Sequence, residues 1–397
     1  MILYSLITAF TIAIACCVAA RRETQLSPKG RMGTPECSVV MGRRYGHGGV
    51  LRRQAFDYVC LAGIFLTLTA LSALRIEVGN DYGKYIDIFH EIYAGTDSAY
   101  VVTEPGFNFV VKAVYVLSGY ENYLLVFALF GAATVFVFLK AMYEQSADFK
   151  LSFAMFMLLG LYFRTFTTVR YYFVLALTLY SLKYVRQKEY GKFALVILFA
   201  ALFHKSVLVV LLFYPLAAFP WKKWMLAGGG VIAAGVFLFQ QQILGLALKL
   251  YPTFQNTVYL TQDIGLKANA SGILRCLFVF LLAALCRRES RKENAANQFY
   301  LKLNLFGFLL YTCGSFLPLV SRLAYYVVTP QILLVPGLIA GLKKGRKKKL
   351  ILALTGAFCL VYFVWFLLTA SGSGIRVLPY QTWIFTEKEW INGSDFF

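Results

Sequence analysis

Long apolar runs separated by short polar turns are the main pattern along this chain. The runs are continuous and do not alternate with a period of two, so they favour helices over the strands of an outer-membrane barrel. A helix needs about 20 apolar residues to cross a bilayer. The expected fold is an all-α, polytopic integral membrane helical bundle that forms a single domain over residues 1–397. Its twelve predicted membrane segments are residues 2–20, 55–75, 122–143, 151–169, 171–185, 192–204, 205–219, 224–244, 271–287, 299–318, 323–342 and 350–370.

The distribution of charge supports these segments. The formal net charge is +20, and most of it lies in a few turns between apolar runs. Loops rich in lysine and arginine stay on the cytoplasmic side of a membrane, and twelve segments that start outside place every such turn there. We therefore expect a multi-pass protein of the bacterial cytoplasmic membrane with both termini outside. In total, 26 basic and 7 acidic residues lie in the turns at 21–53, 140–150, 183–192, 222–223, 287–293 and 343–349.

Several predicted segments are too short to cross a bilayer in the ordinary way. Basic turns lie on both sides of residues 192–219, so the chain must enter and return there, with His204 in the middle. Residues 151–185 are similar, with Arg164 and Arg170 near the outer turn. Broken helices at membrane depth are tolerated where they line a polar cavity. We expect short or re-entrant helices beside an outer-face cavity; tilted helices with basic side chains reaching the surface are the alternative.

Three polar regions complete the predicted layout. Residues 21–54 form a basic cytoplasmic loop, residues 76–121 an outer loop, and residues 371–397 an outer tail. Within the outer loop, residues 105–119 are too short to span the membrane and begin with a proline, which suits a first helical turn. We expect an amphipathic helix there, lying in the membrane interface.

Composition excludes several classes of protein. The chain is 59% hydrophobic and only 15% charged, which is too apolar for a soluble enzyme. The eight cysteines lie mostly in apolar runs, with no CxxC pair and no Cys/His cluster, so we expect neither a metal site nor a disulfide framework. Motifs for nucleotide binding and for hydrolase chemistry are missing from the sequence, so we expect no cofactor and no nucleic-acid partner. The first apolar run precedes Arg21-Arg22 and is expected to be a retained span, with a lipoprotein-like site at Cys16 as the alternative.

A second, smaller group of basic residues falls on the outer side. An arginine beside apolar segments on that side indicates anion binding, and its forked donors suit pyrophosphate. Arg164 and Arg170 lie six positions apart, about two helical turns, so both can face one cavity. Each arginine alone is a weak signal, because interfacial arginines are common anchors, whereas several on one side are more specific. The whole group consists of Arg75, Arg164, Arg170, Lys205, Arg275, Arg322 and Arg376.

The outer turn after the second segment carries a candidate general base. Gly79-Asn80-Asp81 is a turn signal, and it places Asp81 beside Arg75 at the membrane surface. A carboxylate near an arginine can accept a proton, with a pKa set by burial and by that partner. An ordinary turn with a surface ion pair is the alternative, and spacing alone favours it.

The chain contains several short motifs whose order and spacing match those of a known protein family. From about residue 2 to residue 385, outside the basic insert 21–53, it resembles the EpsG family of bacterial exopolysaccharide polymerases, a branch of the Wzy-like polymerases. The chain departs from the family in that insert and at Tyr171, where the family usually has Gln. The motifs are Gly79-Asn80-Asp81-Tyr82 with Tyr85, Glu104-Pro105-Gly106-Phe107, Thr168-Val169-Arg170, Phe203-His204-Lys205-Ser206, Ser321-Arg322-Leu323-Ala324-Tyr325-Tyr326 and Leu378-Pro379-Tyr380.

The resemblance implies a membrane glycosyltransferase that polymerises a polysaccharide such as exopolysaccharide, capsule or O-antigen. Its substrates would be oligosaccharide repeat units carried on a polyprenyl pyrophosphate such as undecaprenyl pyrophosphate, joined on the outer face of the membrane. Membrane lipids, chain-length regulators and flippase proteins are the other partners it implies. The activated lipid donor would supply the energy, which fits a sequence without a nucleotide-binding motif.

Roles for individual residues follow as hypotheses from the resemblance and the topology. Arg170 and Arg322 are expected to bind pyrophosphate, because positive charge stabilises the leaving group. Asp81 is the leading catalytic base, with His204 and Glu104 as alternatives. Supporting contacts to the substrate are expected from Arg75, Arg164, Lys205, Tyr325 and Tyr326.

Two other functions remain open from the sequence. A ligase that transfers finished polymer from the same lipid donor would use the same arginines. A transporter or flippase of lipid-linked sugars would instead line a translocation path with intramembrane charges. The predicted clustering of charge at the outer face, rather than the midplane, favours an enzyme.

Overall fold

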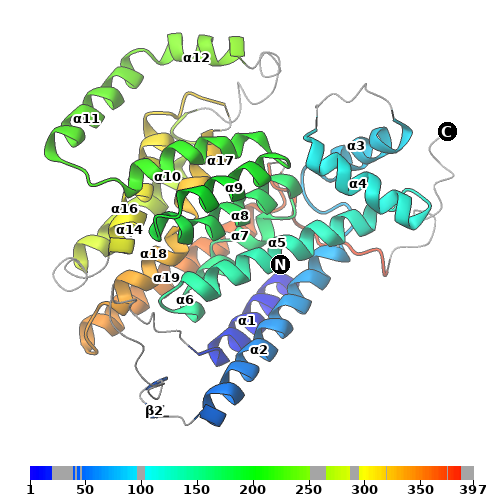
Figure 1. Cartoon of the computed structure of the whole chain (residues 1–397), viewed down its shortest axis with the longest axis horizontal. Helices are drawn as coiled ribbons and strands as arrows, with labels where there is room; N and C mark the ends of the chain where they lie inside the picture. Colours follow the sequence, from blue (N-terminus) through cyan, green and yellow to red (C-terminus); the bar gives the residue numbers. More distant parts are fainter. Residues whose placement is uncertain are drawn as a thin grey trace. The chain divides into compact units, whose positions relative to one another are not determined.

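A computed structural model describes residues 1–19, 39–40, 43–44, 47–95, 103–250, 265–286, 295–318, 320–372 and 374–385. The chain divides into two compact units. Unit 1 comprises Met1–Tyr180, Leu202–Lys205 and Ala353–Phe397, and unit 2 comprises Ser181–Ala201 and Ser206–Leu352. Figure 1 shows the described elements, which are helical apart from one short antiparallel strand pair.

Unit 1 holds the N-terminal helices and the C-terminal end of the chain. The long helix α2 packs against α5 and α1, while α6 contacts α1 and α5 (Figure 1). The helix α8 begins in this unit and α19 ends in it. Its elements are α1 (Ile2–Cys17), β1 (Val39–Val40), β2 (Arg43–Arg44), α2 (His47–Ala73), α3 (Tyr82–Ala94), α4 (Pro105–Ser118), α5 (Tyr123–Gln145), α6 (Phe149–Leu158), α7 (Leu161–Arg164), α8 (Val169–Arg186) and α19 (Arg346–Thr369).

An aromatic cluster joins α3 and α4 to α5. Phe89 of α3 packs with its ring centroid 5.8 Å from that of Phe107 in α4 and 5.2 Å from that of Phe127 in α5. Phe107 also contacts Phe130, one turn along α5, at 5.4 Å. All four rings are at most 4% exposed. Buried aromatic pairs add about 0.5–1.5 kcal/mol each to the energy of burial, so this cluster fixes the position of α4 and of the residues just before it.

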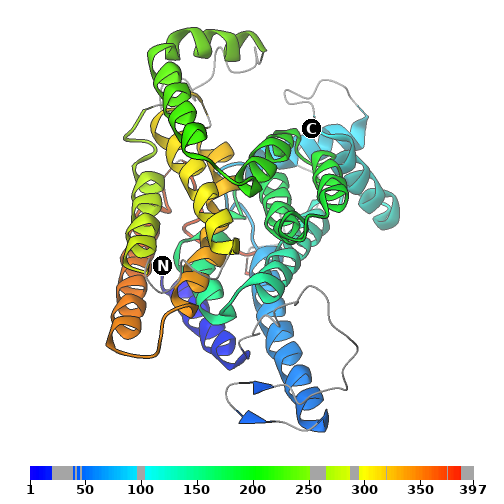
Figure 2. The ribbon, with the colours of Figure 1, turned by 60° about the vertical axis from the view of Figure 1, so that its left-hand side comes forward.

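Unit 2 is built around α16. The neighbours of α16 in this unit are α10, α14, α17 and α18, and α14 also contacts α18. Figure 2 shows α14 and α16 running side by side. The elements of the unit are α9 (Tyr190–Ala201), η1 (Lys205–Val209, mostly in this unit), α10 (Val210–Ala218), α11 (Lys223–Leu238), α12 (Gln240–Leu250), α14 (Ala270–Leu285), α16 (Ala295–Thr312), α17 (Val320–Val328) and α18 (Gln331–Ala340).

Every predicted membrane segment overlaps at least one of these helices. Within the described residues, four helical stretches are long and apolar enough to cross a membrane: Gln54–Ala73, Tyr123–Gln145, Val320–Ala340 and Arg346–Thr369. A fifth candidate is the bent pair Gly228–Leu238 and Gln240–Leu246, whose axes meet at 77°. Shorter apolar helices account for other predicted segments, so the number of crossings stays a prediction while the all-helical, multi-pass character is confirmed.

The predicted breaks in the short segments are present. α9 ends at Ala201 and the 3₁₀ helix η1 begins at Lys205, so His204 lies in a turn between two short helices. The region 151–185 is likewise divided into α6, α7 and α8. α4 runs from Pro105 to Ser118, within the range predicted for a short helix, and its place in the membrane interface stays a prediction. The sequence reading missed α3, whose buried face is formed by Tyr82, Tyr85 and Phe89.

Candidate functional site

Glu104 lies at the point where α4 docks on the turn after α9. It is the N-cap residue of α4, with extended backbone, and Pro105 occupies the first helical position. The next residue, Gly106, donates a backbone hydrogen bond of 2.9 Å to the carbonyl of Leu202. A Cβ on Gly106 would lie 2.8 Å from the Cβ of Leu202, so only glycine permits this approach. This close contact brings Glu104 next to the His204 turn.

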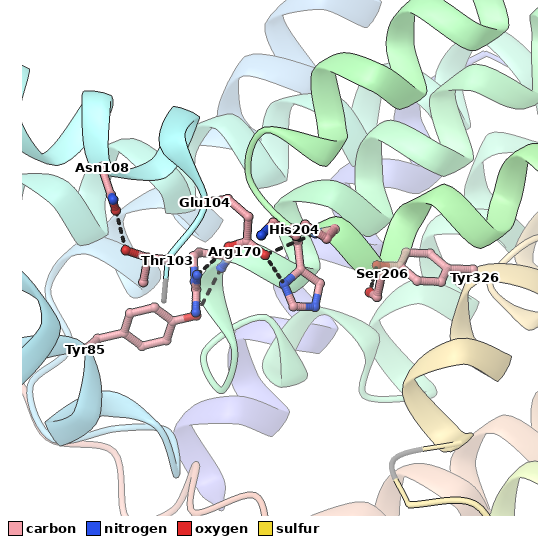
Figure 3. Close-up of polar contacts among 9 residues, drawn as sticks. Tyr85, Thr103, Glu104, Asn108, Arg170, His204, Ser206 and Tyr326 are labelled. Carbon is pink, nitrogen blue, oxygen red and sulfur yellow. Dashed lines mark hydrogen bonds and ion pairs between the residues drawn. The ribbon is translucent and has the colours of Figure 1, made fainter. Parts of the chain in front are cut away.

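The Glu104 carboxylate binds three groups from two other segments (Figure 3). Arg170 donates from Nη1 to Oε2 at 2.6 Å, and the backbone N–H of Lys205 donates to Oε1 at 3.1 Å. His204 Nδ1 lies 3.5 Å from the same Oε1. The Glu104 side chain is only 8% exposed. Residues from the α4 N-terminus, the α8 N-terminus and the α9–η1 turn therefore meet at one carboxylate.

Two aromatic rings hold the guanidinium of Arg170. Its Cζ lies 4.9 Å from the ring centroid of Phe107 and 5.8 Å from that of Tyr85. The hydroxyl of Tyr85 also accepts a hydrogen bond of 3.3 Å from the backbone N–H of Arg170. Nε of Arg170 is buried and has no hydrogen-bond partner among the described residues. Arg170 therefore has a fixed position and a donor that Glu104 does not use.

The local charges keep Glu104 ionised. Burial raises the pKa of its carboxyl, since a charge in a low-dielectric environment is costly. His204, Arg170 and the Lys205 N–H act in the opposite direction and together outweigh burial, so the pKa of Glu104 lies below its ordinary value. At neutral pH, Glu104 is a bound anion with little tendency to take up a proton.

Asp81 lies in a separate polar contact of unit 1. It precedes α3, and its Oδ2 accepts a hydrogen bond of 2.8 Å from the hydroxyl of Thr168. Lys84, one turn into α3, places Nζ 3.9 Å from Oδ1. The side chain of Asp81 is 13% exposed. Asp81 thus ties the turn at residues 79–81 to the residues just before α8, two positions from Arg170.

Arg75 does not form the expected pair with Asp81. Its Nη1 donates to the carbonyl and the hydroxyl of Ser72, at 3.1 and 2.7 Å. Its guanidinium lies over the rings of Phe127 and Phe166, with Cζ 5.2 and 4.8 Å from their centroids. Within the described residues, no carboxylate lies within 4.0 Å of it, and the residue is 1% exposed. In this position Arg75 supports the fold before the turn at residues 79–81 and does not present its charge to solvent.

The remaining predicted basic residues of unit 1 are more accessible. Arg164 is partly exposed at the end of α7 and lies over the ring of Phe366, with Cζ 5.4 Å from the centroid. Lys205 is exposed, and only its backbone N–H belongs to the Glu104 contacts. These two side chains remain candidates for direct contact with an anion.

Unit 2 contains the second group of predicted residues, on α17. Arg322 and Tyr325 are partly exposed, whereas Tyr326 is buried. The Tyr326 hydroxyl lies 2.9 Å from the hydroxyl of Ser206. Arg275 of α14 is buried, with Cζ 5.1 Å from the ring centroid of Tyr325. The structure thus brings Tyr325 next to Arg275, one of the basic residues singled out from the sequence.

The sequence reading singled out Glu104, Arg170 and His204 but not their mutual contact. It also missed the roles of Tyr85 and Thr168, which bind Arg170 and Asp81 respectively. Their only sequence signal was their place inside the same short motifs. In the part of the chain that the structure describes, no three histidine, cysteine or acidic side chains are placed to hold a metal ion.

The long apolar helices define this protein as a multi-pass α-helical membrane protein, with a buried carboxylate, arginine and histidine in contact in one unit. The family model of the EpsG family matches residues 58–382. The chain therefore belongs to the EpsG family, an assignment that indicates a membrane protein of the exopolysaccharide polymerase type. No curated protein and no solved structure matches the chain. The matched region includes every residue of the candidate site.

Proposed function

We propose that this chain is a polysaccharide polymerase that joins oligosaccharide repeat units carried on polyprenyl pyrophosphate. The reaction would take place on the outer face of the bacterial cytoplasmic membrane. The observation that carries the proposal is membership in the EpsG family over residues 58–382, a region that contains the Glu104, Arg170 and His204 contacts. The twelve predicted segments would put the basic turns on one side of the membrane, and this expectation supports the orientation, because such turns remain cytoplasmic.

The arginines would bind the diphosphate of the lipid donor. Arg170 is fixed by Phe107 and Glu104 and retains an unused Nε donor. Arg322 is partly exposed on α17, and Arg164 and Lys205 add accessible positive charge. As the sugar–phosphate bond breaks, negative charge grows on the leaving diphosphate, and preorganised donors stabilise that charge. Arg75, which is fully buried, would act by holding the outer turn in place.

The acceptor sugar must lose a proton as its hydroxyl oxygen attacks. Asp81, Glu104 and His204 are the candidates for accepting it, since all three lie in unit 1. Tyr325, which is partly exposed, would contact the sugar, because an aromatic ring with a hydroxyl offers both an apolar face and a hydrogen-bond donor. Tyr326, which is buried with its hydroxyl against Ser206, would act by supporting α17. The polyprenyl chain would lie in the surrounding lipid, beside the short apolar helices.

The test is a comparison of polysaccharide in a strain that lacks the gene. The strain is complemented with the wild-type chain, with Arg322→Ala or with Arg170→Ala, and both surface polymer and lipid-linked intermediates are resolved on gels. We expect the deletion to lose the polymer ladder and to accumulate single repeat units on lipid, with rescue by wild type only. Accumulation of full-length polymer on lipid would indicate a ligase. An unchanged ladder, in a strain without a second polymerase, would overturn the proposal and point to transport.

A further inference from the structure

Two histidine–glutamate pairs lie in the described part of unit 1, and they differ in burial. In the first, His90 Nδ1 lies 3.1 Å from Glu121 Oε2, with 66% and 25% of the two side chains exposed. In the second, His204 Nδ1 lies 3.5 Å from Glu104 Oε1, with 20% and 8% exposed. Water screens the attraction between His90 and Glu121, so this pair contributes little to stability. The second pair is shielded from water, so the electrostatic interaction between the Glu104 carboxylate and the His204 imidazole is stronger.

We propose that His204 is the general base of the polymerase reaction, acting through Nε2, and that Glu104 is the positioning residue that orients its ring. The inference rests on the proposed function and goes further, because it selects one base from three candidates. It also assigns Glu104 a role that involves no contact with the substrate.

Asp81 is less suited to accept the proton. One of its carboxylate oxygens already accepts a hydrogen bond from Thr168, and the other faces Lys84. Both carboxylate oxygens of Asp81 therefore already face a donor of this chain. The hydrogen bond between Asp81 and Thr168 instead has a structural role, because it joins the turn before α3 to the start of α8.

Glu104 is less suited for the same physical reason. Arg170 binds one of its oxygens, and the N–H of Lys205 binds the other. A carboxylate held by a cation and a backbone donor would lose both interactions on taking up a proton. Its geometry fits the task of holding neighbours in place.

His204 has the geometry that a base requires. Nδ1 faces the Glu104 carboxylate, and Figure 3 shows the second ring nitrogen turned away from it. The ring of Tyr171 packs edge-on against the imidazole, with centroids 5.7 Å apart and planes at 88°. A carboxylate at Nδ1 favours the tautomer with its proton on that nitrogen, so the lone pair lies on Nε2. The 3.5 Å separation is long for a hydrogen bond, but catalytic hydrogen bonds often shorten only when substrate binds.

The glycosyl transfer needs no group beyond the two substrates, His204 and Glu104. The acceptor hydroxyl oxygen forms a bond to the anomeric carbon of the donor sugar, and its proton passes to Nε2 of His204. The bond between that carbon and the diphosphate oxygen breaks, and the diphosphate leaves with the electron pair. His204 is then an imidazolium ion, which the negative charge of Glu104 stabilises. Release of the proton to water or to the departing diphosphate restores the base.

The test measures polymerisation of a lipid-linked repeat unit by the purified full-length chain in lipid vesicles. The variants are His204→Ala, Glu104→Gln and the double variant. We expect His204→Ala to lower kcat by about 10²- to 10⁴-fold, the usual contribution of a general base, and added imidazole to restore part of the rate. Glu104→Gln should lower kcat by about tenfold or more with little change in KM. If Glu104 acts through His204, the double variant will be no slower than His204→Ala, within about threefold.

The exposed pair provides a matched control. Glu121→Gln and His90→Ala remove a histidine–glutamate contact of the same chemistry from the same unit, and both should retain wild-type kcat. Asp81→Asn should retain a rate well above that of His204→Ala. Elution as a single species on size exclusion and a cooperative thermal transition above the assay temperature would show that the His204→Ala and Glu104→Gln chains are folded.

The outcomes separate the two proposals. If the wild-type chain makes polymer and His204→Ala is equally active, the assignment of His204 is wrong while the polymerase function stands. If the effects of Glu104→Gln and His204→Ala multiply, Glu104 acts independently of His204, for example through Arg170, and the positioning role is wrong. If folded wild-type chain makes no polymer from the lipid-linked unit and its deletion leaves the ladder unchanged, both proposals fail together.

Discussion

Glu104 is a single buried anion held by donors from two other segments, and this arrangement has a consequence for acid stability. The pKa of its carboxyl is lowered from the ordinary 4.5, because His204, Arg170 and the Lys205 N–H outweigh the effect of burial. A lowered pKa in the folded state means that Glu104 stabilises the fold fully above pH 4.5. The contribution is then lost as the pH falls through the folded-state pKa.

We therefore predict that Glu104→Gln destabilises the chain at pH 7 by about 3 kcal/mol, because Arg170 then remains buried without a counter-charge. The difference in stability from wild type should shrink as the pH is lowered below 4.5. Thermal unfolding in detergent between pH 2.5 and pH 7.5 measures both effects. A difference that stays constant across this range would show that the charge of Glu104 does not contribute to stability.

The fold requires glycine at position 79, because no residue with a side chain fits its backbone conformation and its surroundings. Its φ of +109° lies in a region that side chains rarely adopt, and a Cβ would collide with the backbone carbonyl of Phe166. Gly83, four positions later in α3, has nothing within 4 Å of its would-be Cβ. We predict that Gly79→Ala lowers the free energy of unfolding by more than about 2 kcal/mol. Gly83→Ala should instead raise it by up to about 1 kcal/mol. Equal thermal midpoints for the two variants would contradict the close contact at Gly79.

At the scale of elements, the docking of α4 on the α9–η1 turn is what assembles the site. Gly106 touches Leu202 through a backbone hydrogen bond and would place a Cβ 2.9 Å from its carbonyl oxygen. Gly191, in the first turn of α9, has no atom near its would-be Cβ and serves as the matched position. A side chain at position 106 would displace α4 from Leu202 and so separate Glu104 from His204, without changing either residue.

We predict that Gly106→Ala reduces polymer formation by about tenfold or more, because a displacement of about 1 Å can disturb catalytic geometry to that extent. Gly191→Ala should leave polymer formation unchanged. Complementation of the deletion strain, with polymer resolved on gels and protein amount checked by immunoblot, makes the comparison. Normal polymer from Gly106→Ala at normal protein levels would show that the docking of α4 does not control the site.

How far the sequence predicts these elements depends on the physical signal each one carries. Pro105 marks the start of α4, and the turn at His204 follows from basic turns that leave too few residues for two full spans. α3 was missed because its apolar positions, Tyr82, Tyr85 and Phe89, lie in a loop rich in charged residues. Two sequence signals for α3 were available. The aromatic positions recur every three to four residues, and a glycine follows at position 95, where the helix ends.

The candidate site divides in the same way. Sequence motifs pointed to Glu104, Arg170 and His204, since a motif identifies the residues that matter. They did not show that one carboxylate binds the other two, because contacts between residues 66 and 100 positions apart are set by the docking of α4. Arg75 was expected beside Asp81 from spacing along the chain, yet its long side chain turns back to Ser72 and packs between two phenylalanines. Spacing gives the place of a backbone atom and leaves the direction of a long side chain open.

At the scale of the whole molecule, the charge distribution predicts which residues face each side of the membrane. Lys84, in α3, is 69% exposed and belongs to the predicted outer loop. Lys344 is exposed in the basic turn between α18 and α19, which is predicted to be cytoplasmic. These two positions report the orientation of the chain, and with it the side on which Glu104 and His204 lie.

We predict that a cysteine at residue 84 reacts with a membrane-impermeant thiol reagent in cells whose cytoplasmic membrane is intact. A cysteine at residue 344 should react only after that membrane is permeabilised. The comparison is made against the wild-type chain, because Cys16 and Cys17 are already exposed and set the background. Retention of polymer formation by Lys84→Cys and Lys344→Cys would show that labelling reports the functional fold. Labelling of residue 344 in intact cells, with residue 84 protected, would reverse the orientation and place the Glu104 site on the cytoplasmic side, where the proposed outer-face polymerisation could not occur.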